Sequence, residues 1–455
     1  MMRPMTLSEL AVPLSATLLG GDRTFTGVST DSRSITAGDL FVALAGENFD
    51  GHAYLPQAAA AGAVGAVVSK PVNADLPLLQ VDDSQRALGL VGAYNRGLYD
   101  GPLVAVTGSS GKTSVKNMIS AVLSRRGETL ATEGNFNNEI GVPLTLLRLD
   151  PRHRFAVVEM GAGRVGDIAW LCQLGRPTIA MVLNAMAAHL DGFGSVDEVA
   201  VAKGEIYDGL GASDIAIVNA DQSWATQWRE RAAPARIIDF AIDQPAVVTA
   251  KKVIGRGIQG TSFTAVTPLG EFEVTLAVPG RHNVANALAA IAVGLACELE
   301  PVEIAAGLAS VRAVDGRLAT RFTAAGTTVI DDCYNANPGS VRAAIDLLAS
   351  CPGRRTLVLG EMRELGPESS ELHRQMGEYA STRGIDRFWG VGPVLSSAVS
   401  AFGHGGTLFD DRQAAIAAVP GSFDVDDTVL IKGSRGAGME LVLAAFDSVP
   451  VREIG

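Results

Sequence analysis

The feature that most constrains the fold of this chain is a strand, a glycine-rich turn and a helix in direct succession. The β-branched run at 103–107 predicts a buried strand, and the apolar spacing at 114–126 predicts a helix. Between them glycines at 108 and 111 allow the backbone N–H groups to turn inward, and the helix N-terminus adds unpaired N–H groups. The loop is therefore expected to bind a polyphosphate. The residues predicted to contact a nucleotide here are Gly108, Ser109, Ser110, Gly111, Lys112, Thr113 and Ser114.

Two side chains of this loop suit phosphates and their metal ion. Lys112 would reach the β- and γ-phosphates of a nucleotide, and Thr113 would place its hydroxyl on Mg²⁺. The general pattern G-x-x-x-x-G-K-[ST] requires glycine at position 106, where this chain has Val106, and Gly108 stands two residues later. The Gly-Lys-Thr run between a strand and a helix still predicts phosphate binding.

Length, charge and cysteine content narrow the class of protein. A chain of 455 residues suggests about three domains. Its net charge of −12 argues against a nucleic-acid-binding surface and favours small-molecule partners. Four cysteines without a C-x-x-C pair argue against a disulfide framework and against a zinc site, which suits a reducing cytosol. No signal peptide is recognised, and the most apolar run, 287–297, is too short to span a bilayer, so a soluble cytoplasmic protein is expected.

The pattern of apolar runs divides the chain into three α/β regions. Residues 1–83 alternate short strand-like runs with turns and predict a small domain. Residues 84–315 alternate strands with helices, which predicts a doubly wound parallel sheet with an antiparallel excursion at 247–278. Residues 316–455 restart the alternation and predict a second Rossmann-like domain. Strands of the central sheet are expected at 103–107, 155–159, 179–184 and 215–219.

Two residues follow strands of the predicted central sheet. Glu159 ends the strand at 155–159, where a nucleotide-binding sheet carries an Mg²⁺ ligand. A solvated acid is the alternative, and it is less favoured because this strand is expected to share a sheet with the phosphate loop. His189 follows the strand at 179–184, and the residues alone leave open whether it is a ligand or an ordinary hydrogen-bonded histidine.

Polar clusters also follow strands of the predicted third domain. Residues 331–338 combine two acids, a tyrosine and two asparagines, which suits a nucleoside, although Asn337 could merely cap a helix that begins at Pro338. Residues 432–436 place two cations, Lys432 and Arg435, after the last strand. Near the N-terminus, the clusters at 29–33 and 46–52 are typical of surface turns on composition alone.

Taken in order, these motifs resemble the Mur ligases of peptidoglycan synthesis. The matching stretches are 107–113, 159–161, His189, 202–205, 280–286, 316–317 and 332–338, together with the two N-terminal clusters. The glycine at 108 is also this family's form of the loop. Residues 135–143 and 360–366 are similar to the member that adds D-alanyl-D-alanine to UDP-N-acetylmuramoyl-tripeptide. The resemblance implies an ATP- and Mg²⁺-dependent amide ligase that acts through an acyl phosphate, and a cytoplasmic monomer is expected.

The resemblance also implies roles for individual residues. The catalytic residues would be Lys112, Glu159, His189 and Lys203, and the metal ligands Thr113, Glu159, His189 and, if it is carbamylated by CO₂, Lys203. The remainder of the nucleotide site would be Asn283, Arg317, Asp332, Tyr334, Asn335 and Lys432. The UDP-sugar would lie beside Ser29, Asp31, Ser32, Arg33, Glu47, Asp50 and His52. The other substrate contacts would be Asn137, Asn138, Asn337 and Arg435.

Three questions stay open at this point. The apolar spacing at 199–206 would ordinarily leave Lys203 as a surface residue with its ammonium in water. The neighbouring ligase that adds the third amino acid, or a P-loop NTPase switch that makes no bond, would share many of these motifs. The third residue of the accepted tripeptide, meso-diaminopimelate or lysine, and the arrangement of the domains are not determined.

Overall fold

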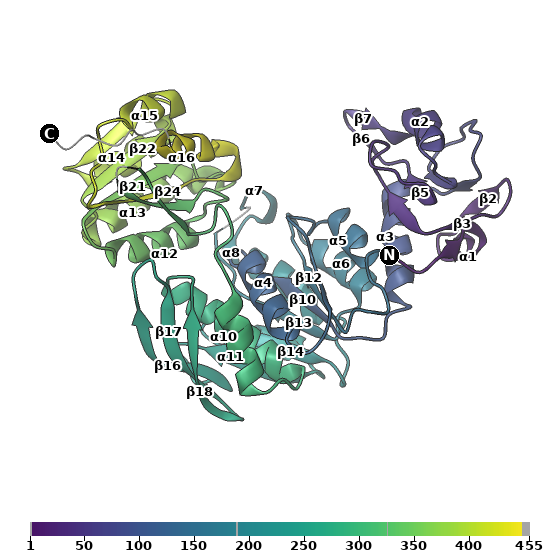
Figure 1. The fold of residues 1–455 in the computed structure, drawn as a ribbon, viewed down its shortest axis with the longest axis horizontal. Coiled ribbons are helices and arrows are strands. Elements are labelled where there is room, and N and C mark those ends of the chain that lie inside the picture. The colour runs from purple at the N-terminus through teal and green to yellow at the C-terminus, as the bar shows by residue number, and fades with distance from the viewer. Residues whose placement is uncertain (1, 188–189, 325, 448–455) are drawn as a thin grey trace.

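The computed structural model describes residues 2–187, 190–324 and 326–447 (Figure 1). Three large β-sheets follow one another along the chain, and each is built from one contiguous stretch of sequence. The N-terminal and C-terminal sheets lie at opposite ends of the long axis in Figure 1, with the central sheet between them. The three-region α/β architecture expected from the sequence is confirmed, whereas the boundaries at 83/84 and 315/316 stay a prediction.

The N-terminal sheet has five strands in the order β2-β9-β8-β5-β4, and only β2 is antiparallel to its neighbour. Its strands are β2 (Thr17–Leu19), β4 (Gly27–Ser29), β5 (Asp39–Val42), β8 (Gly65–Val68) and β9 (Leu78–Gln80). Two small pairs flank it: β1 (Met5–Thr6) with β3 (Thr24–Phe25), and β6 (Ala45–Gly46) with β7 (Phe49–Asp50). The helices of this region are α1 (Leu7–Ala11) and α2 (Leu55–Ala60).

Helix α3 (Ser84–Arg96) joins the N-terminal region to the central one. Asp83 begins the helix by accepting hydrogen bonds from the backbone N–H groups of Gln85 and Arg86. Leu88 and Val91 are buried with the apolar core of the N-terminal sheet, and the helix also packs against α5 and α6 of the central region. One helix therefore fixes the two regions to each other.

The central sheet has nine strands in the order β11-β12-β10-β13-β14-β15-β16-β17-β18. The first seven are parallel, and β16 to β18 form an antiparallel meander, so both sequence predictions for this region are confirmed. The strands are β10 (Leu103–Thr107), β11 (Thr129–Ala131), β12 (Phe155–Glu159), β13 (Ile179–Val182), β14 (Ile215–Asn219), β15 (Arg236–Ala241), β16 (Val248–Gly255), β17 (Thr261–Thr267) and β18 (Gly270–Leu276).

Helices cover both faces of the central sheet, which is why its inner strands are apolar without alternation. Val104 and Val106 of β10 face α4 (Lys112–Leu123), α10 (Arg281–Ala296) and α11 (Pro301–Ser310). Leu103 and Ala105 face the opposite layer. That layer consists of α5 (Gly141–Leu146), α6 (Asp167–Gly175), α8 (Val196–Gly204) and α9 (Ala225–Arg231), and α7 (Leu190–Phe193) precedes α8.

The C-terminal sheet has six strands in the order β19-β20-β24-β21-β22-β23, and only β19 is antiparallel. The strands are β19 (Ala319–Phe322), β20 (Thr328–Asp332), β21 (Arg354–Gly360), β22 (Arg387–Val391), β23 (Gly406–Phe409) and β24 (Asp427–Lys432). Its helices are α12 (Pro338–Ala349), α13 (Ser369–Thr382), α14 (Ser396–Phe402), α15 (Arg412–Ala418) and α16 (Glu440–Asp447). Short 3₁₀ turns are η1 (Gly51–Tyr54), η2 (Glu205–Tyr207), η3 (Gly366–Glu368), η4 (Pro393–Leu395) and η5 (Arg435–Ala437).

No helix within residues 2–187, 190–324 and 326–447 has both the length and the apolar character needed to cross a bilayer.

Candidate functional site

A cavity of about 590 Å³ lies where the carboxyl ends of the central strands face the C-terminal region. Its walls come from the loop and helix start at 109–114, the ends of β12 to β14, the start of α10, the segment just before β19, the end of β20 with the residues after it, and the end of β24. In a parallel α/β sheet, ligands bind at this edge. The cavity therefore brings together segments that are more than 200 residues apart in the sequence.

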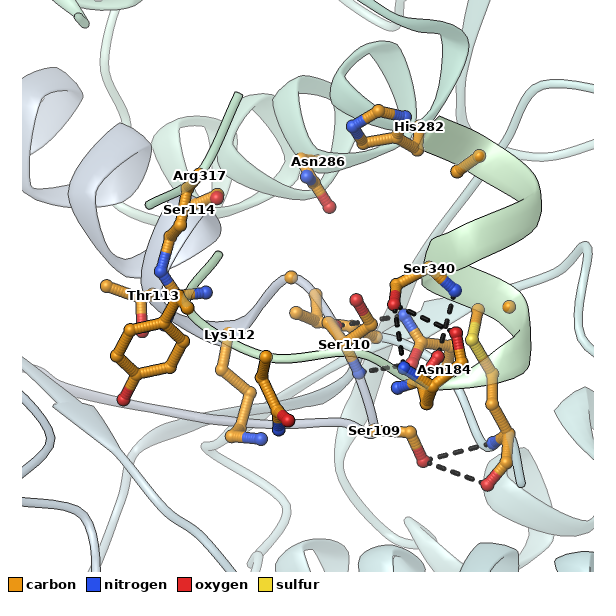
Figure 2. Close-up of a pocket in the computed structure, with 18 of the residues that line it drawn as sticks. Ser109, Ser110, Lys112, Thr113, Ser114, Asn184, His282, Asn286, Arg317 and Ser340 are labelled. Atoms are coloured by element: carbon orange, nitrogen blue, oxygen red, sulfur yellow. Dashed lines mark hydrogen bonds between the residues drawn. The ribbon is translucent and has the colours of Figure 1, made fainter. Parts of the chain in front are cut away.

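The loop presents a helix N-terminus to this cavity (Figure 2). Gly111 has φ +84°, a left-handed conformation that favours glycine, and a Cβ there would lie 2.9 Å from Asn286 Oδ1. Helix α4 begins at the next residue, Lys112. Among the described residues, the backbone N–H groups of 111–114 have no acceptor, so four donors at the positive end of the helix dipole face the cavity. This arrangement is suited to an anion such as a nucleotide phosphate.

Lys112 folds back over the loop in this structure. Its Nζ donates a hydrogen bond to the carbonyl oxygen of Gly108 at 2.8 Å. Desolvation lowers the pKa of Lys112, whereas the nearby Glu159 carboxylate opposes that effect. The ammonium is thus held at the phosphate loop.

Glu159 is the centre of a chain of hydrogen bonds at the end of β12. Its Oε2 accepts from Thr113 Oγ1 at 2.8 Å, and its Oε1 accepts from Asn137 Nδ2 at 2.7 Å. Arg317 Nη2 donates to the same threonine hydroxyl at 2.9 Å, and its guanidinium stacks 4.0 Å from the ring centroid of Tyr334. Glu159 is 2 % exposed, so the solvated-acid alternative does not describe this structure.

These oxygen donors fit a magnesium ion. Mg²⁺ prefers hard oxygen ligands and is commonly held by one or two protein groups together with substrate phosphates. Thr113 and Glu159 supply a hydroxyl and a carboxylate 2.8 Å apart beside the phosphate loop. His189, the other predicted ligand, lies outside the described residues. No group of three or more His, Cys, Asp or Glu side chains suited to a metal ion occurs among residues 2–187, 190–324 and 326–447.

Lys203 lies in the wall of the same cavity and is buried. Its side chain is 2 % exposed, so the surface position expected from the helical pattern is wrong. In the described part of the chain its ammonium makes no hydrogen bond or ion pair, and the Phe193 ring lies 5.9 Å from Nζ. Burial, aided by the charge of Lys112, lowers the pKa of Lys203 to about 7. A substantial fraction of this amine is therefore neutral near physiological pH.

The C-terminal region supplies a second charged pair to the cavity. Lys432 Nζ donates to Asp332 Oδ2 at 2.5 Å and to the carbonyl oxygen of Asn335 at 2.9 Å.

His282 and Asn337 also line the cavity. Desolvation, together with the Lys432 ammonium, lowers the pKa of His282 to about 4, so this ring is neutral at physiological pH. Asn337 caps α12 by accepting from the backbone N–H of Ser340 at 2.8 Å, as the alternative interpretation expected, while it also lines the cavity.

Asparagines at the start of α10 complete this wall. Asn283 Nδ2 donates to the carbonyl oxygen of Pro279 at 2.7 Å, and Asn286 Nδ2 donates to Asn283 Oδ1 at 3.0 Å. Both side chains are buried, and their orientation is fixed by this short chain of hydrogen bonds. Most residues predicted for the nucleotide site and the catalytic centre therefore meet in one cavity: Ser109 to Ser114, Asn137, Asn138, Glu159, Lys203, Asn283, Arg317, Asp332, Tyr334, Asn335, Asn337 and Lys432.

The residues predicted to hold a UDP-sugar lie elsewhere. Ser29, Asp31, Ser32, Arg33, Glu47, Asp50 and His52 belong to the N-terminal region and do not line the cavity, nor does Arg435. Arg33 pairs with Asp31 at 2.7 Å. His52 Nδ1 bonds Asp50 at 2.6 Å while its Nε2 accepts from the backbone N–H of Ser69, so both ring nitrogens have partners within the protein.

Sequence reasoning missed two residues of the cavity region. Asn184 follows β13 and binds the backbone of Ser110 with both ends of its amide. Lys116, one turn into α4, is buried and donates to the carbonyl oxygen of Thr132 at 2.6 Å. A polar residue after a strand and a lysine on an apolar helix face were the available signals, but neither pattern specifies a partner.

Comparison with known proteins agrees with this arrangement. Family models match residues 24–96 (Mur ligase family, catalytic domain), 106–294 (Mur ligase middle domain) and 316–435 (Mur ligase, glutamate ligase domain). The UDP-N-acetylmuramoyl-tripeptide--D-alanyl-D-alanine ligase of Escherichia coli K12 is 46% identical over 444 residues, covering 97% of this chain and 98% of that protein.

Solved structures agree as well. A crystal structure of MurF from Acinetobacter baumannii superposes with a TM-score of 0.92 at 34% identity, over 98% of this chain and 99% of that one. The MurF ligase of Thermotoga maritima in complex with ADP superposes with a TM-score of 0.83 at 29% identity, over 92% and 96% of the two chains. Three consecutive family models, a full-length relative and full-length structural matches lead to one conclusion: the chain belongs to the Mur ligase family.

Proposed function

We propose that this chain is the ATP-dependent ligase that adds D-alanyl-D-alanine to UDP-N-acetylmuramoyl-tripeptide, forming ADP and phosphate. The observation that carries this proposal is the relative of that name, which is 46% identical over 97% of this chain. The cavity supports it, because a phosphate loop and a buried carboxylate face cationic groups of another region there. The ADP complex of the Thermotoga maritima relative supports ATP as the nucleotide.

The reaction must bring two anions together. The carboxylate of the tripeptide attacks the γ-phosphorus of ATP, ADP leaves, and an acyl phosphate forms. The N–H groups of 111–114, Lys112 and Arg317 are placed to stabilise charge on the phosphate oxygens. Mg²⁺, held through Thr113 and Glu159, would supply further neutralisation of those oxygens.

The second step makes the amide bond. The neutral amine of D-alanyl-D-alanine attacks the acyl carbon and a tetrahedral intermediate forms. Phosphate then leaves with the bonding electron pair, and the nitrogen gives up one proton, which the departing phosphate can accept. The cavity is walled by both the central and the C-terminal regions, so water is excluded only while these regions are in contact. Arg317 makes one such contact by its hydrogen bond to Thr113.

We assign the other residues that the sequence predicted by their resemblance to the family and by their place in the structure. Asn283, Asp332, Tyr334, Asn335 and Lys432 would hold the nucleoside and its phosphates, and Asn137, Asn138 and Asn337 the peptide. Ser29 to Arg33, Glu47, Asp50 and His52 would hold the UDP-sugar, at a distance from the reacting carboxylate. Lys203, with a neutral amine free to react with CO₂, is proposed to be carbamylated and to act with His189 at the metal.

One assay tests the proposal. Phosphate release is measured with ATP and Mg²⁺ while UDP-N-acetylmuramoyl-tripeptide and D-alanyl-D-alanine are each omitted in turn, and the product mass is recorded. A ligase of this kind releases phosphate only when both are present, and the mass of the UDP-sugar peptide then rises by that of the dipeptide less one water. Phosphate release without the two substrates would indicate an NTPase switch. Ligation of a single amino acid to UDP-N-acetylmuramoyl-dipeptide would indicate the neighbouring ligase that adds the third amino acid.

Two companion measurements complete the assignment. Tripeptides that contain meso-diaminopimelate and lysine are compared in the same assay to define the third residue. We propose a monomer that acts in the cytoplasm, where ATP and nucleotide sugars are available. Light scattering after size exclusion would overturn the monomer assignment if it gave a mass larger than that of one 47.2 kDa chain.

A further inference from the structure

Asn184, the second residue after β13, holds the phosphate loop by its backbone. Its Oδ1 accepts from the backbone N–H of Ser110 at 2.9 Å, and its Nδ2 donates to the carbonyl oxygen of the same residue at 3.1 Å (Figure 2). The two bonds fix which end of the amide faces which group. One side chain therefore satisfies both polar backbone groups of a residue in the middle of the loop.

The segment that carries Asn184 is itself anchored. Asn219 donates to the carbonyl oxygen of Leu183 at 2.7 Å, and Gln222 accepts from the backbone N–H of Ala185 at 3.1 Å. Both anchors belong to the end of the next strand, β14, and the turn after it. The position of Asn184 thus follows from the central sheet, and the sheet in turn positions the loop.

A second contact parallels the first. Ser109 Oγ accepts from the backbone N–H of Met186 at 3.0 Å, and the Ser109 backbone N–H donates to the carbonyl oxygen of Asn184 at 3.1 Å. The N–H groups of residues 109 and 110 are therefore directed to the 184–186 segment. The next four N–H groups, those of 111–114, face the cavity without an acceptor in the described chain.

This division of the loop matters because the loop is short. Only four residues separate the end of β10 at Thr107 from the start of α4 at Lys112, and Val106, where the general pattern has glycine, is a buried strand residue paired with Glu159. The conformation that presents the N–H groups of 111–114 is therefore set by few residues. Without a partner for Ser110, its N–H and carbonyl would turn toward water in the cavity, and the following N–H groups would turn with them.

We propose that Asn184 is a positioning residue for nucleotide binding, which fixes the phosphate loop so that the N–H groups of 111–114 converge on one anion. This role rests on the proposed function in that the loop is taken to bind the phosphates of ATP. The amide itself touches the loop backbone and acts on the nucleotide only through it.

The test is Asn184→Ala, with direct titration of the full-length protein by ATP and Mg²⁺ and, separately, by UDP-N-acetylmuramoyl-tripeptide. ATP is expected to bind about 10- to 100-fold more weakly, which corresponds to about 1.4 to 2.8 kcal/mol, while the affinity for the sugar nucleotide is unchanged. Asn184→Asp keeps an acceptor for the Ser110 N–H, but it replaces the Nδ2 donor by a carboxylate oxygen that would lie against the Ser110 carbonyl oxygen. It is expected to bind ATP no better than the alanine variant.

The chain offers a matched control in Asn95. Its buried amide also makes two hydrogen bonds to backbone groups, the carbonyl oxygens of Leu146 and Leu149, at 2.8 and 3.1 Å, and it lies away from the cavity. Asn95→Ala is expected to lower the melting temperature without changing ATP affinity. Wild-type ATP affinity in both Asn184 variants, or equal loss of affinity for both ligands, would overturn the positioning role. Failure of the wild-type protein to bind ATP would instead overturn the proposed function.

Discussion

Replacing Lys203 by methionine should raise stability while it abolishes ligation. The side chain is 2 % exposed, and burial lowers its pKa from 10.5 to about 7. Folding near neutral pH must therefore either discharge this amine or bury its charge. Since each pKa unit corresponds to about 1.4 kcal/mol, the lysine costs the folded state on the order of 4 kcal/mol there. Methionine has a similar shape and carries no such cost.

The pH dependence of this effect has a definite sign. Below about pH 7 the amine is protonated in both the folded and the unfolded states, so the cost is complete. Between about 7 and 10.5 the unfolded state binds more protons than the folded state, so the stability of the wild type rises with pH. Above that range both states are neutral and the cost is gone. The stability advantage of Lys203→Met should thus be largest at about pH 6 to 7 and shrink steadily as the pH rises.

The assay is thermal or urea unfolding across this pH range in buffers depleted of CO₂, with ligation measured in parallel. Lys251→Met is the control, because Lys251 is exposed and its pairing with the exposed Glu271 should contribute little to stability. Added bicarbonate should stabilise the wild type only, since a carbamate replaces the buried cation. A Lys203→Met variant that is less stable than the wild type near neutral pH would refute the reasoning, and an active variant would remove Lys203 from the catalytic centre.

Three further substitutions test the cavity. Lys112→Ala should leave the melting temperature nearly unchanged and lower kcat by about 10² or more, because charge on the transferred phosphoryl group loses its nearest cation; near-normal turnover in a folded variant would contradict the phosphate assignment. Glu159→Gln keeps the shape but loses the charge, so activity should collapse at ordinary Mg²⁺ concentrations; a wild-type rate with unchanged Mg²⁺ dependence would exclude a metal role. Lys116→Met removes the hydrogen bond that holds the Thr132 carbonyl, and we expect kcat/KM to fall about tenfold as the segment before Asn137 loosens; steady-state kinetics that match the wild type would assign Lys116 to stability alone.

The strands were predictable from sequence because their pattern is local. β-branched runs bounded by turns located β10, β12, β13 and β14 of the central sheet, and β13 differs from its predicted range only by ending two residues earlier, at Val182. The neighbouring strands β11 and β15 were not predicted. The ends of helices were less predictable. α4 begins at Lys112, two residues before the apolar pattern starts, because Gly111 already turns the chain into the helix. α10 begins at Arg281, six residues before the apolar run, since its first turns carry polar residues that face the cavity.

The site was predictable where a motif is local and unpredictable where contacts are distant. The glycine-rich loop and the strand-terminal Glu159 follow from short-range patterns. The hydrogen bond from Arg317 to Thr113 joins residues 204 positions apart, and no local pattern encodes it. For Lys203, helical spacing alone favoured the surface, because spacing does not reveal that a cavity wall covers one lysine; its catalytic role was predicted only from the family resemblance. Asn184 was missed because a polar residue after a strand is common and its partner, the Ser110 backbone, carries no side-chain signature.

The left-handed backbone of Gly111 has a consequence for inhibitors. Every other amino acid would strain this position, and a Cβ would also meet Asn286 Oδ1, which is held in place within the α10 wall. A larger residue at position 111 could block a compound that contacts Gly111. The same substitution would distort the loop that the enzyme needs for catalysis. Compounds designed to contact this glycine would therefore leave little room for resistance by substitution at the point of contact.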